Sequence, residues 1–227
     1  MSDQLAVSMR TTSSNARDFM GALSSHGFGR IQLDSLHCDF HNLTNSGLRD
    51  LASTLQRNGL KPSGVDFLAP PTNWETDSDQ TLTGFGRAIE IASSIGRVPV
   101  SVCIPPRDEI IDAIVASGTE VGVLIAAHGA KPLNNPQIGW GLPVSLLAKE
   151  DRPMEALAGA SFGPIALRLT GNVIESSTIA IDEETLELRE LRGVLDAMRW
   201  TPSPVIDAST DYAELMALAW EKAGETN

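Results

Sequence analysis

The chain alternates between helical and extended patterns from residue 17 to about residue 104, and this alternation constrains its fold more than any other feature. Apolar residues at helical spacing alternate with short apolar runs, and each helix ends near a glycine. The segments are, in order, helix 17–25, strand 30–36, helix 47–56, strand 63–68, helix 82–94 and strand 98–104. Such alternation is typical of parallel strands joined by helices. The sequence therefore predicts a parallel sheet covered by helices.

Four further runs bring the expected strands to seven. They lie at residues 5–9, 121–126, 165–169 and 204–207, with further helices expected at 108–116, 185–198 and 212–223. An eight-fold barrel needs one more strand, which we expect near 178–181, where the pattern is weak. We predict a compact α/β TIM-like barrel of seven to eight parallel strands, with the seventh strand weak or absent. No linker or repeat divides the chain, so residues 1–227 are predicted to form a single domain.

Composition excludes some partners. The 227 residues carry a formal net charge of −12, which argues against nucleic acid and membrane surfaces as partners but leaves a small anionic ligand possible in a local basic pocket. Cys38 and Cys103 have neither a C-x-x-C nor a zinc spacing, so we expect two reduced thiols. No signal peptide or membrane span is recognisable, and the expected location is cytoplasmic.

Several polar residues fall at or just after the ends of predicted strands. In a parallel barrel these ends open on one face, so the side chains are expected to converge on one mouth. Two arginines there suit a carboxylate or phosphate, and a histidine beside a carboxylate suits a general base. The alternative is that they are loop-end polar groups and structural ion pairs. The residues are Arg10, Asp66, Arg107, His128, Asn172 and Asp207.

The loop after the second strand carries a second group of candidates. Asp34, His37 and His41 lie there, and a His-x-x-x-His spacing suits a metal when it is helical. The segment is not expected to be helical and no third ligand is apparent, so the simpler interpretation is an exposed polar loop. Asp34 and His37 are kept as candidate substrate-binding residues. Arg168 lies within a strand and is expected to pair with a carboxylate such as Asp207, or else to face a ligand.

Two tryptophans lie in the expected long loops 70–80 and 130–142. Trp74 and Trp140 fall on the predicted mouth side, where they can cover an apolar or sugar-like ligand. Aromatic residues are also enriched at subunit interfaces, so a homo-oligomer remains the alternative. Trp140 is included among the candidate substrate-binding residues.

Three segments resemble one family of barrels. Residues 23–33 look like that family's first helix end and second strand, residues 55–63 like its next helix-to-strand junction, and residues 87–100 like its third helix and fourth strand. In order and spacing they resemble the xylose-isomerase-like TIM barrels, the sugar-phosphate isomerase/epimerase superfamily. The resemblance covers about the first 130 residues and implies a small hydroxylated or carboxylated substrate.

The resemblance also implies a divalent metal, but most of its ligands are missing. His128 and Gly129 match the fifth-strand Glu-x-His-Gly pattern, whereas Ala126 stands in place of the glutamate. Residues 169–173 lack the Asp-x-x-His expected after the sixth strand, and the seventh-strand histidine has no counterpart. Asp207 matches the eighth-strand glutamate. We therefore predict no metal ligands and no cofactor.

Two functions follow as hypotheses. In the first, the chain is a metal-independent isomerase, epimerase or lyase in which His128 and Asp207 are catalytic and Arg10 or Arg107 binds an anion. In the second, it is a degenerate barrel that serves as a ligand sensor or partner subunit. The sequence favours neither strongly, because likeness of fold alone does not establish activity.

Overall fold

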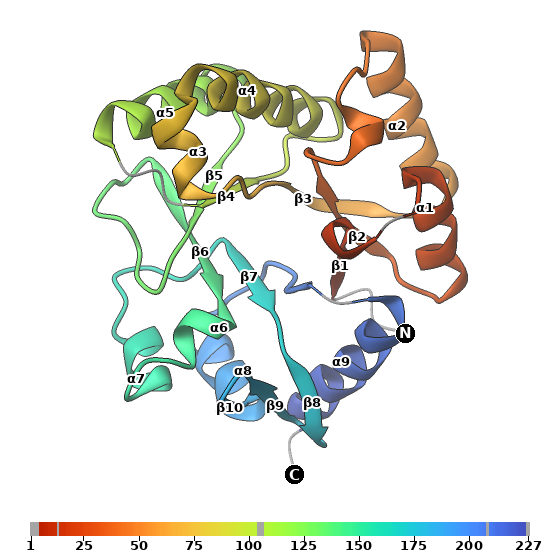
Figure 1. Cartoon of the computed structure of the whole chain (residues 1–227). Helices are drawn as coiled ribbons and strands as arrows, with labels where there is room; N and C mark the ends of the chain where they lie inside the picture. Colours follow the sequence, from red (N-terminus) through yellow and green to blue (C-terminus); the bar gives the residue numbers. More distant parts are fainter. Residues whose placement is uncertain (1–4, 13, 104–106, 208, 226–227) are drawn as a thin grey trace.

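Eight parallel strands form a closed barrel in the computed structural model, which describes residues 5–12, 14–103, 107–207 and 209–225. Their order around the barrel is β1-β11-β7-β6-β5-β4-β3-β2 (Figure 1). The predicted α/β barrel is therefore confirmed. The strands are β1 (Ala6–Ser8), β2 (Arg30–Asp34), β3 (Lys61–Phe67), β4 (Val100–Cys103), β5 (Ile125–His128), β6 (Ile138–Pro143), β7 (Ala166–Leu169) and β11 (Val205–Ile206).

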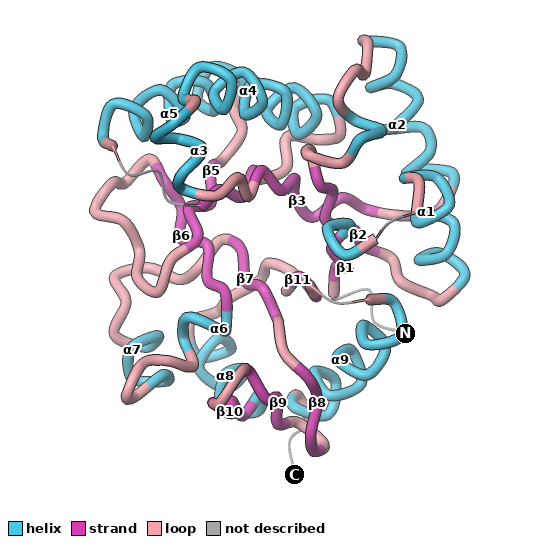
Figure 2. Tube along the Cα trace, viewed as in Figure 1, coloured by secondary structure: helices cyan, strands magenta, loops and turns pink. Residues whose placement is uncertain are grey.

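Helices surround this barrel (Figure 2). In the described part of the chain, none of them is long and apolar enough to cross a bilayer. Their bounds are α1 (Ala16–Ser25), α2 (Asn45–Arg57), α3 (Pro71–Thr76), α4 (Ser78–Ser94), α5 (Asp108–Val121), α6 (Val144–Leu147), α7 (Pro153–Ala158), α8 (Leu188–Ala197) and α9 (Thr210–Ala223), with 3₁₀ turns η1 (Met9–Thr11) and η2 (Cys38–Phe40).

The barrel strand that the sequence was expected to supply near residues 178–181 is instead β6. β6 occupies the second half of the expected loop 130–142, extends to Pro143, and pairs with β5 on one side and β7 on the other. Two glycines and a final proline within its six residues obscure the pattern of a strand. The strand predicted at residues 165–169 is β7, and it is consequently the seventh barrel strand in chain order. The expected site, β9 (Thr178–Ile181), belongs to a separate antiparallel sheet with β8 (Asn172–Glu175) and β10 (Glu184–Glu187).

Some boundaries also differ from expectation. The strand predicted at 121–126 begins at Ile125, because α5 runs on to Val121 and ends in a left-handed Gly122 with φ of 71°. β10 takes the first residues of the helix predicted at 185–198. The strand predicted at 98–104 ends at Cys103, and residue 104 lies outside the described residues.

The two faces of the barrel strands differ in chemistry. Side chains facing the helices are buried and apolar, whereas those facing the barrel axis are small or polar, as strand alternation assigns them. The small residues leave room along the axis for one long side chain. Outward residues include Val65, Phe67, Val100, Val102, Ile125, Ala127, Trp140 and Leu142; inward residues include Ser8, Gln32, Asp66, Ser101, Ala126, Gly139, Gly141 and Arg168.

Candidate functional site

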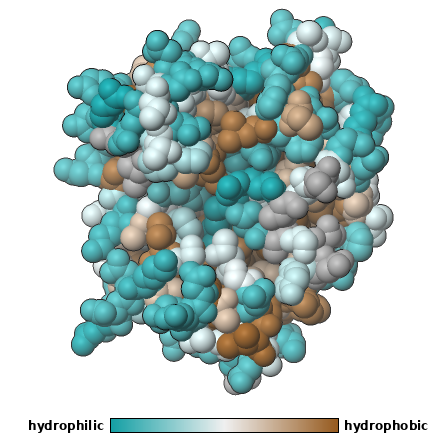
Figure 3. Space-filling model, viewed as in Figure 1, coloured by the Kyte–Doolittle hydropathy of each residue, from teal (hydrophilic) through white to brown (hydrophobic). Residues whose placement is uncertain are grey.

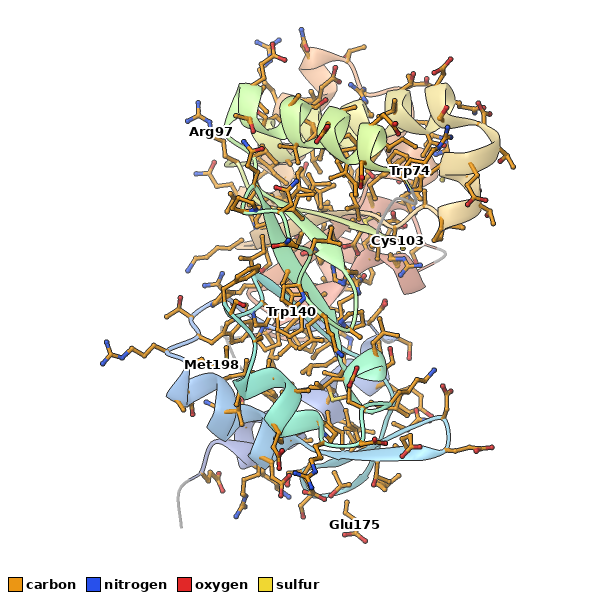
Figure 4. The ribbon with its side chains drawn as sticks, turned by 90° about the vertical axis from the view of Figure 1, so that its left-hand side faces the viewer. Trp74, Arg97, Cys103, Trp140, Glu175 and Met198 are labelled. Atoms are coloured by element: carbon orange, nitrogen blue, oxygen red, sulfur yellow. The ribbon has the colours of Figure 1, made fainter. Side chains whose placement is uncertain are left out.

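The C-terminal ends of the strands form one face of the molecule. In Figure 4, Trp74 and Cys103, which follow or end strands, lie on one side, while Arg97 and Met198, which follow helices, lie on the opposite side. Figure 3 looks onto the first face and shows hydrophilic side chains gathered near its centre. The face has the polarity expected of the mouth of a parallel barrel.

An ion pair crosses the barrel beneath this mouth. Arg168 on β7 donates to both carboxylate oxygens of Asp66 on β3, with Nη1–Oδ1 and Nη2–Oδ2 distances of 2.8 Å each. Both side chains are almost fully buried. A bidentate geometry of this kind is the strongest arrangement available to an arginine and a carboxylate. The pair therefore places a fixed guanidinium on the barrel axis.

Neighbouring strands complete this network. Arg168 Nη2 donates to the Ser8 hydroxyl at 3.1 Å, and Arg168 Nε donates to Asp207 Oδ2 at 3.3 Å. The Gln32 amide donates to Asp66 Oδ1 at 2.8 Å. Arg10 lies nearer to solvent, with its Nη1 3.6 Å from Asp207 Oδ2. The predicted pairing of Arg168 with Asp207 is confirmed. Arg168 also pairs with Asp66, which was not predicted.

Arg168 and Asp66 shift each other's pKa toward the charged form. Burial opposes ionisation of Asp66, but the Arg168 guanidinium and the Gln32 amide hold the pKa of this carboxyl below its ordinary value. Burial would likewise lower the pKa of Arg168, but Asp66 and Asp207 raise it above its already high ordinary value. Arg168 and Asp66 therefore both stay charged at neutral pH.

His128 ends β5 on the inward face of the mouth. Its side chain is 9% exposed, and neither ring nitrogen has a hydrogen-bond partner among the described residues. The predicted pairing of His128 with Asp207 is wrong, because the Asp207 carboxylate is held by Arg168 and Arg10 instead. Buried polar atoms in proteins almost always have partners. Both ring nitrogens are therefore free to hydrogen-bond to a ligand or to water.

The environment keeps this imidazole neutral. Burial, reinforced by the nearby Arg168 guanidinium, lowers the pKa of His128 to about 3. The ring lies against Gly141 of β6, where a Cβ atom would come within 2.6 Å of the ring carbon Cδ2. Glycine is therefore required at residue 141 for the ring to take this position. A neutral imidazole presents one donor and one acceptor to the mouth.

Three further polar residues end or follow barrel strands on the same inward-facing side as His128. Asp34, at the end of β2, is partly buried, and burial raises its pKa. Cys103 pairs in register with His128, and burial raises the pKa of its thiol. Thr170 follows β7, and its buried hydroxyl has no partner among the described residues. Cys103 and Thr170 were not among the sequence candidates, although strand alternation with His128 and Arg168 would have identified them.

Two candidate substrate-binding residues, Trp140 and Asn172, do not line the mouth. Trp140 is buried on the outward face of β6, and its Nε1 donates to the Gly129 carbonyl at 2.8 Å, so its expected role as a loop lid is wrong. Trp74 is likewise fully buried. Asn172 is exposed and pairs with Ala180 in the separate sheet rather than reaching the mouth.

Arg107 and His37 have structural partners. Arg107 donates to the Trp74 carbonyl at 3.0 Å and precedes α5. His37 immediately precedes η2 and lies beside Cys38 and Asp39, and the ligand atoms of these three residues lie within 4.8 Å of one another. His37 Nε2 is 3.1 Å from the Ser14 carbonyl, and its Nδ1 accepts from the Asp39 backbone. These contacts tether η2 to the start of α1.

The residues at the mouth do not fit a divalent metal. Ala126 and Gly139 occupy the inward positions of β5 and β6, and neither side chain offers a ligand atom. The carboxylates on the axis already surround the Arg168 guanidinium. Among the described residues, the group of three histidine, cysteine or carboxylate side chains within reach of one ion is His37, Cys38 and Asp39 after β2, and it includes none of the inward-facing barrel residues.

Comparison with known proteins agrees with this architecture. No family model matches the chain, and no curated sequence matches it. A solved xylose isomerase domain protein from Planctomyces limnophilus superposes with a TM-score of 0.70 at 12% identity, covering 98% of both chains. An L-ribulose 3-epimerase gives 0.69 at 13% identity, over 98% of this chain and 92% of that one.

A third match is the IOLI protein, solved with a binding zinc atom. It gives a TM-score of 0.67 at 17% identity, over 97% of this chain and 94% of that chain. Similarity at these identities establishes the fold and leaves the chemistry to the site itself. The chain has the fold of the xylose isomerase-like TIM barrels, as its sequence resemblance predicted.

Proposed function

We propose that the mouth binds a small hydroxylated molecule carrying a carboxylate or phosphate, and moves a proton on it without a divalent metal. The observation that carries this proposal is His128, a buried imidazole whose two ring nitrogens have no partner among the described residues. Leaving such groups unsatisfied costs about 1–3 kcal/mol. A ligand oxygen that hydrogen-bonds to the ring offsets this cost.

The anion is assigned to Arg10. Its side chain is 40% exposed and its contact with Asp207 is long, at 3.6 Å, so the guanidinium is accessible to a second carboxylate or a phosphate. Arg168 supplies a second positive charge but is held by Asp66, Asp207 and Ser8. Arg168 therefore acts as a positioning residue, which fixes the Asp207 carboxylate beneath Arg10.

The proton transfer is assigned to Asp34 and His128. Burial raises the pKa of Asp34, which makes its carboxylate a stronger base than an exposed one. Asp34 takes a proton from a carbon beside a carbonyl; the C–H electron pair becomes a carbon–carbon double bond, and the carbonyl oxygen gains the negative charge. The N–H of neutral His128 donates to that oxygen. Return of the proton from Asp34 to the same carbon regenerates the substrate. Its delivery to the former carbonyl carbon, with transfer of the neighbouring hydroxyl proton through His128 to the former carbonyl oxygen, gives an isomer.

Binding tests the first half of this proposal. Metal-free protein is screened by thermal shift against sugar acids, hydroxy acids and sugar phosphates, and positive compounds are measured by calorimetry. We expect Arg10→Gln to weaken binding by about tenfold or more, while Arg189→Gln, an exposed arginine on α8, leaves it unchanged. Equal binding by both variants would place the site elsewhere, and no stabilising compound would favour the partner-subunit hypothesis.

A further inference from the structure

A groove of about 890 Å³ lies beside the mouth, between the loop that follows β2 and helix α4. Its volume is within the range of small-molecule sites, about 300–1,000 Å³. Ser35 and Phe67 line it, and each is the chain neighbour of a mouth residue, Asp34 or Asp66. The groove is therefore a separate space on the outer side of β2 and β3.

Small residues on α4 open this space. Gly84 lies against the Phe67 ring, where a Cβ atom would come within 3.0 Å of it. A Cβ atom on Gly86, one of the groove-lining residues, would meet nothing within 4 Å. Leu36 provides an apolar surface on the facing loop and is 43% exposed. The groove thus combines the apolar side chain of Leu36 with two glycine positions on α4.

Planar polar side chains gather at one end of the groove. Asn73, Asp77 and Gln80 line it, and none of these three side chains hydrogen-bonds to another described residue. The nearby hydroxyls of Thr81 and Thr83 are already donated to backbone carbonyls. Two amides and a carboxylate offer both donors and acceptors, which is the combination that a row of hydroxyl groups requires.

The charges of the groove oppose an anionic ligand. Arg87 pairs with Glu90 on the same helix, which leaves the Asp77 carboxylate uncompensated among the lining side chains. We propose that the groove is a second binding site, which takes a neutral hydroxylated molecule such as a monosaccharide or cyclic polyol. The hydroxyls bind Asn73, Asp77 and Gln80, and the C–H face of the ligand packs on Leu36.

The test fills the groove and leaves the mouth intact. Saturation-transfer NMR is recorded with D-glucose, D-fructose and myo-inositol as probes, on wild type, Gly86→Phe and Gly21→Phe. Gly21 is a matched control, because it also lies within a helix, is partly exposed and has nothing within 4 Å of a built Cβ, but is outside the groove. Gln80→Ala tests the polar end without adding bulk.

We expect at least one probe to bind wild type and Gly21→Phe equally, and its affinity to fall by about tenfold or more in Gly86→Phe and several-fold in Gln80→Ala. Arg10→Gln keeps this binding, which separates the groove from the anion site at the mouth. The proposal is overturned if no probe binds wild type, if Gly86→Phe binds as wild type does, or if Arg10→Gln abolishes the signal.

Discussion

Arg168 on β7 and Asp66 on β3 are joined across the barrel by two hydrogen bonds of 2.8 Å each. Removing one partner leaves the other charge buried and unpaired, which costs about 3–5 kcal/mol. We predict that Arg168→Met and Asp66→Asn each lower the free energy of unfolding by about this amount. The double variant is expected to regain most of the loss, because a neutral pair of similar volume replaces two charges.

Urea unfolding of the four proteins measures this coupling. The expected result is a double-mutant cycle with an interaction energy of about 2 kcal/mol or more. Losses that simply add would show that the ion pair does not organise the barrel interior.

The position of His128 depends on Gly141. A methyl group at residue 141 would come within 2.6–2.8 Å of three ring atoms, so either the ring or the strand must move. We predict that Gly141→Ala costs about 1–3 kcal/mol of stability and weakens any ligand that contacts His128. Gly193→Ala is the control, because nothing lies within 4 Å of its Cβ position, and it should be neutral or slightly stabilising. Unfolding curves that respond equally to both substitutions would refute the contact.

The depressed pKa of His128 predicts a pH dependence. The folded protein binds no proton at this ring until about pH 3, whereas the unfolded chain binds one below about pH 6.5. Stability from this group is therefore complete above pH 6.5 and is lost as pH falls toward 3, by about 1.4 kcal/mol per pH unit over most of that range. The His128→Gln variant lacks this group, so it does not show this loss of stability as pH falls.

Denaturant titrations of wild type and His128→Gln between pH 7 and pH 4.5 check this. Asp34 acts in the opposite direction, since its raised pKa lowers stability as pH rises from the ordinary carboxyl range, but it is present in both proteins and cancels in the difference. Wild type should lose stability faster than the variant as pH falls. Parallel curves would mean that the ring is accessible to protons in the folded state.

Much of the fold could be predicted from the sequence, because regular periodicity marks most of the strands and helices. β6 could not, because its residues Ile138 to Pro143 include two glycines and a proline, and only pairing between β5 and β7 makes them a strand. Thr178–Ile181 has a strand's composition and is a strand, but it pairs with β8 and β10 outside the barrel. Local pattern predicts a strand and does not predict its partners.

The candidate site could be predicted in part. Strand ends correctly placed Arg10, His128 and Asp207 on the mouth face, and Arg168 within a strand indicated an ion pair. The pairing of Arg168 with Asp66 could not be predicted, because the two residues lie 102 positions apart and only barrel closure brings them together. Trp140 was expected in a loop, because β6, the strand that contains it, was not predicted.

The central claim is that the mouth moves a proton without a divalent metal, and solvent exchange tests it most directly. Protein treated with a chelator and verified metal-free is mixed in D₂O with a compound that binds in an Arg10-dependent manner, and proton NMR follows its C–H signals. We expect wild type to incorporate deuterium beside the carbonyl. We expect Asp34→Asn to lose about 10²-fold or more of this exchange while it retains binding. No exchange in wild type, or exchange that appears only when a divalent metal is added, would contradict it.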